Sequence, residues 1–216
     1  MKKLSFFIKP VKNTEGFLLI EVAIALLIIG LLIGGVLKGK ELLETSKLQA
    51  VIKNLETYRV ATQLFQDRYG FLPGDFPEAT TYLNSTLKDG NGNGAVEDSE
   101  SSQFWAHLSV SGFLQASTKE APQEKIGGCV TVVHTPAPDL PGNWFLLGER
   151  NGSKNDGALL TPIQAKTLCQ KMDNPNPNEG SVQVKDGANV PPGSCIDQGQ
   201  FNGKTKNPAC VVYVAL

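Results

Sequence analysis

The 216-residue sequence has few of the residues that usually carry catalysis or hold metals. It contains only two histidines, His107 and His134, and its four cysteines form no CxxC pair. We therefore do not expect zinc, whose sites combine closely spaced cysteines and histidines. Nucleophile-elbow, HExxH, P-loop and dinucleotide-binding glycine motifs are also missing. No catalytic constellation is recognisable, and we expect the protein not to be an enzyme.

A strong charge of one sign is missing as well. Twenty basic and 21 acidic residues give a formal net charge of −1. A general nucleic-acid-binding protein needs a basic surface that neutralises phosphates. The sequence shows no such bias and no repeat, so we expect no nucleic-acid partner.

What the sequence does contain is one long apolar run near its beginning. From Phe17 to Leu37 every residue is apolar or glycine, except Glu21. As a helix this run is about 30 Å long, which matches the hydrocarbon core of a bilayer. Four lysines and one acid precede it, and basic flanks stay on the cytoplasmic side. We predict a single membrane span with the following residues outside the cytoplasm, the alternative being a buried core helix.

The residues at the start of the run are specific. The segment Glu15-Gly16-Phe17-Leu18-Leu19-Ile20-Glu21 resembles the prepilin signal shared by type IV pilins and the pseudopilins of type II secretion. The resemblance implies that a membrane peptidase cuts between Gly16 and Phe17 and methylates the new amino terminus of Phe17. Residues 1–16 are then a leader. The run is followed by no Ala-x-Ala-like site, which argues against an ordinary secretory signal peptide.

Glu21 is the only charged residue in the run. A carboxylate inside hydrocarbon costs several kcal/mol unless it is paired or protonated. After cleavage, the amine of Phe17 is one helical turn away on the same face. The resemblance implies that Glu21 of one subunit pairs with the Phe17 amine of its neighbour during filament growth. A carboxylate that reaches the edge of the bilayer is the alternative.

Beyond the span, the pattern predicts that the helix continues outside the membrane. Between Lys38 and Tyr69 there is no proline and only one glycine, and apolar residues recur with a helical period. We predict a transmembrane or filament-core helix over 17–37 and an amphipathic periplasmic helix over 38–70, ended by Gly70 and Pro73.

Residues 71–216 are expected to form a globular head. Strand patterns fall at residues 129–133, 144–147, 181–185 and 211–216, and helix patterns at residues 78–87, 104–113 and 161–172. The last of these helices starts with the capping box Thr161-Pro-Ile-Gln164. The expected fold class is α+β: a long N-terminal membrane-spanning helix that continues into a rod, packed on a small head with an antiparallel sheet.

All four cysteines lie in the part predicted to be outside the cytoplasm. An even number in an oxidising compartment suggests disulfides, and four cysteines allow three pairings. We favour Cys195–Cys210, which closes a short loop, together with Cys129–Cys169. Reduced, buried thiols are the alternative.

One segment of the head matches a calcium-loop pattern. Asp89-Gly-Asn-Gly-Asn-Gly94, with Glu100 six residues later, fits D-x-[DN]-x-[DN]-G-x5-E. In that pattern the Ca²⁺ ligands are Asp89, Asn91, Asn93, the carbonyl of Ala95 and a bidentate Glu100. Two neutral amides make the expected affinity modest, and an Asn-Gly-rich loop without metal is the alternative.

Together these patterns predict a structural subunit, a pseudopilin or minor pilin, of a type IV pilus or type II secretion filament. The partners implied are other pilin or pseudopilin subunits, the prepilin peptidase/methyltransferase and the bacterial inner membrane. The protein is expected to cross that membrane once, with a cytoplasmic N-terminus and a periplasmic head, and to enter the filament on assembly. The alternative is a membrane-tethered periplasmic binding or adhesion module that does not polymerise.

Overall fold

The computed structural model describes residues 19–115 and 120–216. The protein divides into two compact units, of which the first ends at Leu43 and the second comprises Glu44–Leu216. One helix, α1 (Leu19–Tyr69), contributes to both units. The predicted continuation of the apolar helix into the amphipathic segment is therefore confirmed over the described residues.

In the second unit, α1 buries one face in the core. The buried residues are three or four positions apart, as one face of a helix requires: Leu48, Val51, Ile52, Leu55, Tyr58, Ala61, Thr62 and Phe65. The helix ends where expected. Gly70 adopts φ +79° and donates its N–H to the carbonyl of Gln66 at 2.8 Å, which is a conformation that glycine adopts without strain.

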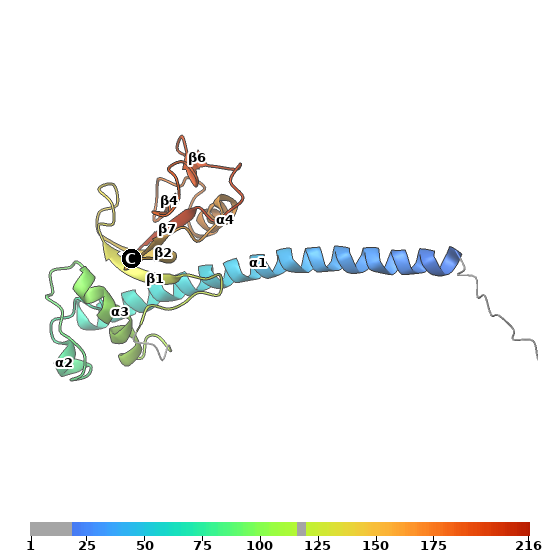
Figure 1. Cartoon of the computed structure of the whole chain (residues 1–216). Helices are drawn as coiled ribbons and strands as arrows, with labels where there is room; N and C mark the ends of the chain where they lie inside the picture. Colours follow the sequence, from blue (N-terminus) through green and yellow to red (C-terminus); the bar gives the residue numbers. More distant parts are fainter. Residues whose placement is uncertain (1–18, 116–119) are drawn as a thin grey trace, which may run out of the picture. The chain divides into compact units, whose positions relative to one another are not determined.

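The sheet of this unit is antiparallel. It has the order β1-β2-β7-β4, formed by β1 (Cys129–His134), β2 (Asn143–Asn151), β7 (Cys210–Ala215) and β4 (Val182–Asp186), as Figure 1 shows. A hairpin adds β3 (Lys154–Gly157) to β2, and β5 (Ile196–Asp197) pairs with β6 (Gln200–Phe201) in a separate ribbon. The four predicted strands are confirmed. The other three were not predicted, because they are short and carry no apolar alternation.

Both faces of the sheet are covered. Side chains such as Val130, Phe145 and Val212 belong to the same buried cluster as the apolar face of α1. On the opposite face, Trp144 and Tyr213 pack in a second cluster with Leu140 and partly buried Ala137 of the β1–β2 connection. Burial on both faces explains why β2 and β7 contain continuous apolar runs instead of alternating ones.

Three further helices complete the unit: α2 (Ala79–Tyr82), α3 (Asp98–Val110) and α4 (Pro162–Met172). The capping box of α4 is confirmed, with Gln164 N donating to Thr161 Oγ1 at 3.3 Å. α2 is shorter than the predicted 78–87. α3 contains the predicted apolar residues Phe104, Trp105 and Leu108 and begins at Asp98, with Glu100 in its first turn. Glu97 and Glu100 form a capping box in which the Glu97 N–H donates to Glu100 Oε2 at 3.2 Å.

The structure joins Cys195 to Cys210 in a disulfide. A bridge across this separation of 15 residues contributes about 3 kcal/mol by restricting the unfolded state. The predicted Cys129–Cys169 pair is wrong, because both thiols are free. Cys129 opens the edge strand β1, whereas Cys169 lies on α4, which packs against β4 and β7 near the other edge. A disulfide needs Cα atoms about 4.4–6.8 Å apart. Neighbouring strands are about 4.8 Å apart, and β2 lies between β1 and β7, so the two cysteines are too far apart to form a bridge.

Peptide mapping without reduction is therefore expected to find Cys195 linked to Cys210 and no other bridge. Under native conditions an alkylating reagent should label Cys129, which is partly exposed, and spare Cys169, which is buried until the protein unfolds. A peptide that links Cys129 to Cys169 would contradict this arrangement and restore the pairing expected from sequence.

Candidate functional site

The first unit presents an apolar helical surface. All large aliphatic side chains of α1 from Leu19 to Leu37 are exposed. The helix is long and apolar enough to cross a membrane. Each such side chain forgoes about 1.5–3 kcal/mol when it stays in water. The sum exceeds the total stability of a typical domain, so this surface requires lipid or another apolar surface.

Glu21 lies in this surface and in the first turn of α1 as described. Its side chain is exposed, and it has no partner among the described residues. The processing residues Gly16 and Phe17 lie outside the described residues, so the pairing of Glu21 with the Phe17 amine stays a prediction. Over residues 19–37, the described structure shows one carboxylate, Glu21, on an exposed apolar helical surface.

The head contains a buried carboxylate, Asp75, whose role the sequence patterns did not reveal. Asp75 is 1% exposed, and its carboxylate accepts three backbone N–H groups from the 89–100 loop. Gly92 donates at 2.7 Å and Asn93 at 3.1 Å to Oδ1, and Gly94 donates at 2.8 Å to Oδ2. A Cβ at Gly90 would overlap the backbone of Asp75, so only glycine allows this close approach. A buried carboxylate thus organises the glycine-rich loop.

The two acidic residues of the predicted calcium set are bonded to different parts of the head. Asp89 accepts from Thr80, from its N–H at 2.8 Å and its hydroxyl at 2.9 Å. The Thr80 N–H lowers the pKa of Asp89. Glu100 accepts the N–H of Asn91 at 3.0 Å and that of Glu97 at 3.2 Å. In the described part of the protein, no three or more His, Cys, Asp or Glu side chains are grouped to hold a metal ion.

The amide ligands of that set form local turns. Asn91 Oδ1 accepts the N–H of Asn93 at 2.9 Å, and Asn93 Oδ1 accepts the N–H of Ala95 at 2.8 Å. The N–H groups of the loop converge on Asp75, an arrangement that suits an anion and not a cation. As arranged, these residues do not fit a calcium site, and calcium binding stays a prediction from sequence.

His107 ties this region to α3. The ring is fully buried and stacks on Phe65, with 6.1 Å between the ring centroids. Nδ1 accepts the N–H of Gly74 at 2.9 Å, so Nε2 carries the proton and donates to the carbonyl of Lys88 at 3.2 Å. Burial lowers the pKa of His107, which favours this neutral form. The histidine has a structural role here, while His134 is exposed and bonded to Asn143.

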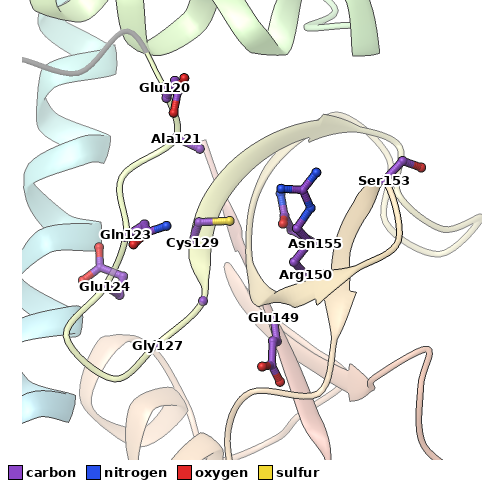
Figure 2. A pocket seen from close by; sticks show the side chains of 11 residues that line it. Glu120, Ala121, Gln123, Glu124, Gly127, Cys129, Glu149, Arg150, Ser153 and Asn155 are labelled. Atoms are coloured by element: carbon purple, nitrogen blue, oxygen red, sulfur yellow. The ribbon is translucent and has the colours of Figure 1, made fainter.

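A cavity of about 440 Å³ opens beside the free thiol of Cys129. Figure 2 shows the Cys129 sulfur facing Arg150 and Asn155, with Gln123 and Glu124 on the other side. Burial raises the pKa of the thiol more than the nearby Arg150 lowers it, so the unreactive protonated form is favoured. The lining contains no histidine that could act as a base. This geometry does not assemble a nucleophilic site.

Glu124, at the edge of this cavity, is an anchor. It is 6% exposed and accepts from Tyr58 Oη at 3.0 Å and Asn54 Nδ2 at 2.9 Å. Burial raises the pKa of Glu124, and burial together with this carboxylate raises the pKa of Tyr58. Both donors lie on α1, so Glu124 fastens its loop to the helix within the second unit.

Comparison of the sequence and structure with family models, curated proteins and solved structures found no match.

Proposed function

We propose that this protein is a subunit of a type IV pilus or type II secretion filament, as a pseudopilin or minor pilin. The observation that carries the proposal is Glu21, the one carboxylate in the exposed apolar stretch of α1 from Leu19 to Leu37. A monomeric anchor gains nothing from a membrane carboxylate, which costs several kcal/mol unless it is paired. A subunit whose neighbour brings an amine to that carboxylate gains a contact.

The basic leader supports the proposed topology. Lysines before the span keep the N-terminus in the cytoplasm and place the head in the periplasm of the bacterial inner membrane. The prepilin peptidase then removes residues 1–16 and methylates Phe17. This step supplies the amine that Glu21 is proposed to meet.

The glycines of the span support helix-to-helix contact. A Cβ added at Gly30, Gly34, Gly35 or Gly39 would meet no atom within 4 Å among the described residues. Packing among the described residues therefore does not require glycine at these four positions, although each glycine weakens a helix by about 1 kcal/mol relative to alanine. Gly30 and Gly34 share one side of the helix, and Gly35 and Gly39 another, because residues four apart share a face. Two sides that allow close approach suit a subunit that contacts two neighbours.

The α+β layout of the described residues supports the same proposal. A long helix is apolar at its start and carries a small antiparallel sheet unit on its later part. The rival is a membrane-tethered periplasmic binding or adhesion module. Such a module would share the helix, the sheet and the disulfide, and it would differ in having no lateral contacts between helices.

Cross-linking in the membrane tests the proposal. A Cys129→Ser protein with two new cysteines in the helix, Leu26→Cys and Leu37→Cys, is oxidised in intact membranes and separated without reduction, since Cys129 is itself a free and partly exposed thiol. Because contacts in an open filament are heterologous, each subunit can link to two neighbours, and a ladder beyond dimers is expected. The matched controls are the two single variants, which should stop at dimers. A double variant that stays monomeric at the expression level of assembled protein would favour the tethered module.

A further inference from the structure

The sequence contains four Asn-Gly steps: Asn91-Gly92, Asn93-Gly94, Asn151-Gly152 and Asn202-Gly203. In such a step the backbone nitrogen of glycine loses its proton and attacks the amide carbon of the asparagine side chain. The C–N bond of that amide breaks, ammonia leaves, and a succinimide ring forms. Water then opens the ring to aspartate or isoaspartate. The reaction needs a glycine N–H that is free and accessible to water, so the folded structure decides which step reacts.

The two steps of the 89–100 loop are restrained by Asp75. The N–H of Gly92 donates to its carboxylate at 2.7 Å and also to its backbone carbonyl at 3.1 Å. The N–H of Gly94 donates to the same carboxylate at 2.8 Å. Both attacking nitrogens are held as donors to a negative group, which opposes loss of their protons.

The step at Asn202 is restrained through the asparagine. Its backbone N–H donates to Cys195 O at 2.8 Å, and its side-chain amide donates to Gly193 O at 2.8 Å. Its side-chain oxygen accepts the N–H of Lys204 at 3.1 Å. These bonds lie in and beside the loop that the Cys195–Cys210 disulfide closes. They prevent the Asn202 side chain from rotating to bring its amide carbon to the attacking nitrogen.

Asn151-Gly152 differs from the other three steps. It lies at the tip of the β2–β3 hairpin, where Asn151 pairs with Lys154 and both residues of the step are exposed. Gly152 adopts φ +63°, and its N–H has no acceptor among the described residues. The Asn151 side chain is held there by one bond, from Nδ2 to Asp156 Oδ1 at 3.0 Å. Exposed hairpin tips are also the segments that open most easily.

We propose that Asn151 is a site of spontaneous deamidation in the folded protein, with water as the only co-reactant. The product replaces the amide donor by a carboxylate that faces Asp156. A hydrogen bond is thereby exchanged for repulsion between two negative groups at the hairpin tip. The modification adds one negative charge beside Arg150 and Ser153, which line the cavity of Figure 2.

The test is incubation of the full-length protein, folded in detergent, at mildly alkaline pH in heavy-oxygen water, followed by peptide mapping. Each hydrolysis inserts labelled oxygen at the asparagine that reacted. The same protein, unfolded in denaturant, is the internal reference, because there all four steps are equally free. In the folded protein we expect Asn151 to keep its unfolded rate within about threefold and the other three sites to slow by about tenfold or more.

Two variants control the assignment. Asn151→Gln should abolish the early acidic species on ion-exchange chromatography, and Asn151→Asp should elute with that species from the start. If Asn151 is slowed in the folded protein as strongly as Asn91, Asn93 and Asn202, or if another of the four reacts first, the proposal is wrong.

Discussion

The variant Glu21→Ala is expected to insert into the membrane and to be processed normally, yet to lose the cross-linked ladder. An apolar replacement favours insertion, because it removes the only charge from the span. In the proposed filament, however, the Phe17 amine of the neighbour would remain buried without its partner. Leaving one member of a buried pair alone costs about 3–5 kcal/mol at each contact. The measurement is the Leu26→Cys, Leu37→Cys ladder in the Glu21→Ala background.

Matched variants separate charge pairing from other effects. Glu44→Ala removes a carboxylate from the same helix, where it forms only an exposed ion pair with Lys47 at 3.0 Å. An exposed pair contributes about 0–1 kcal/mol, so this ladder should be unchanged. Intact-mass measurement that places the N-terminus at Phe17 in each variant controls for processing. An equal ladder in wild type and Glu21→Ala would mean that Glu21 has no part in assembly and would favour the tethered module.

Local patterns in the sequence were enough to predict the elements that bury apolar residues. The period of three and four residues from Leu48 to Phe65 located the buried face of α1. The capping box Thr161–Gln164 predicted the start of α4, because the residues that make up the pattern are the same ones that form the first turn of the helix. Short polar strands such as β3 could not be predicted in this way, because they are extended through pairing with a neighbouring strand and not through a pattern in their own sequence.

The organising centre of the head could not be predicted, because its parts are far apart in sequence. Asp75 lies in a proline-rich turn, and the N–H groups that it accepts come from residues 17 to 19 positions later. The asparagines and glycines of residues 89–94 fit the sequence pattern of a calcium loop as well as they fit the observed loop, in which they surround Asp75. The same limit applies to Cys169, whose distance from Cys129 depends on the strand order β1-β2-β7-β4.

Asp75→Ala is expected to be the most destabilising single change in the head loop. The substitution removes three hydrogen bonds to a buried carboxylate at once. The N–H of Gly94 is left without an acceptor, whereas those of Gly92 and Asn93 keep only the Asp75 carbonyl and Asn91 Oδ1. Hydrogen bonds to charged groups contribute about 1.5–3 kcal/mol each, and because they act together we expect a total loss of about 3–5 kcal/mol. For a unit of this size the melting temperature should fall by about 10 °C, measured by circular dichroism of the full-length protein in detergent.

The same measurement decides between a loop held by Asp75 and a loop held by calcium. Asp75→Asn should be intermediate, since it keeps one acceptor oxygen and presents an N–H₂ group to the remaining donors. Asp89→Ala should cost less than Asp75→Ala, because Asp89 is exposed and its bonds from Thr80 lie at the surface, whereas Asp75 is buried. If Asp75 holds the loop, calcium and a chelator should leave the melting temperatures of wild type and Asp75→Ala unchanged. A rise with calcium in the wild type that is lost in both Asp89→Ala and Glu100→Ala would instead establish the metal site that the sequence pattern predicts.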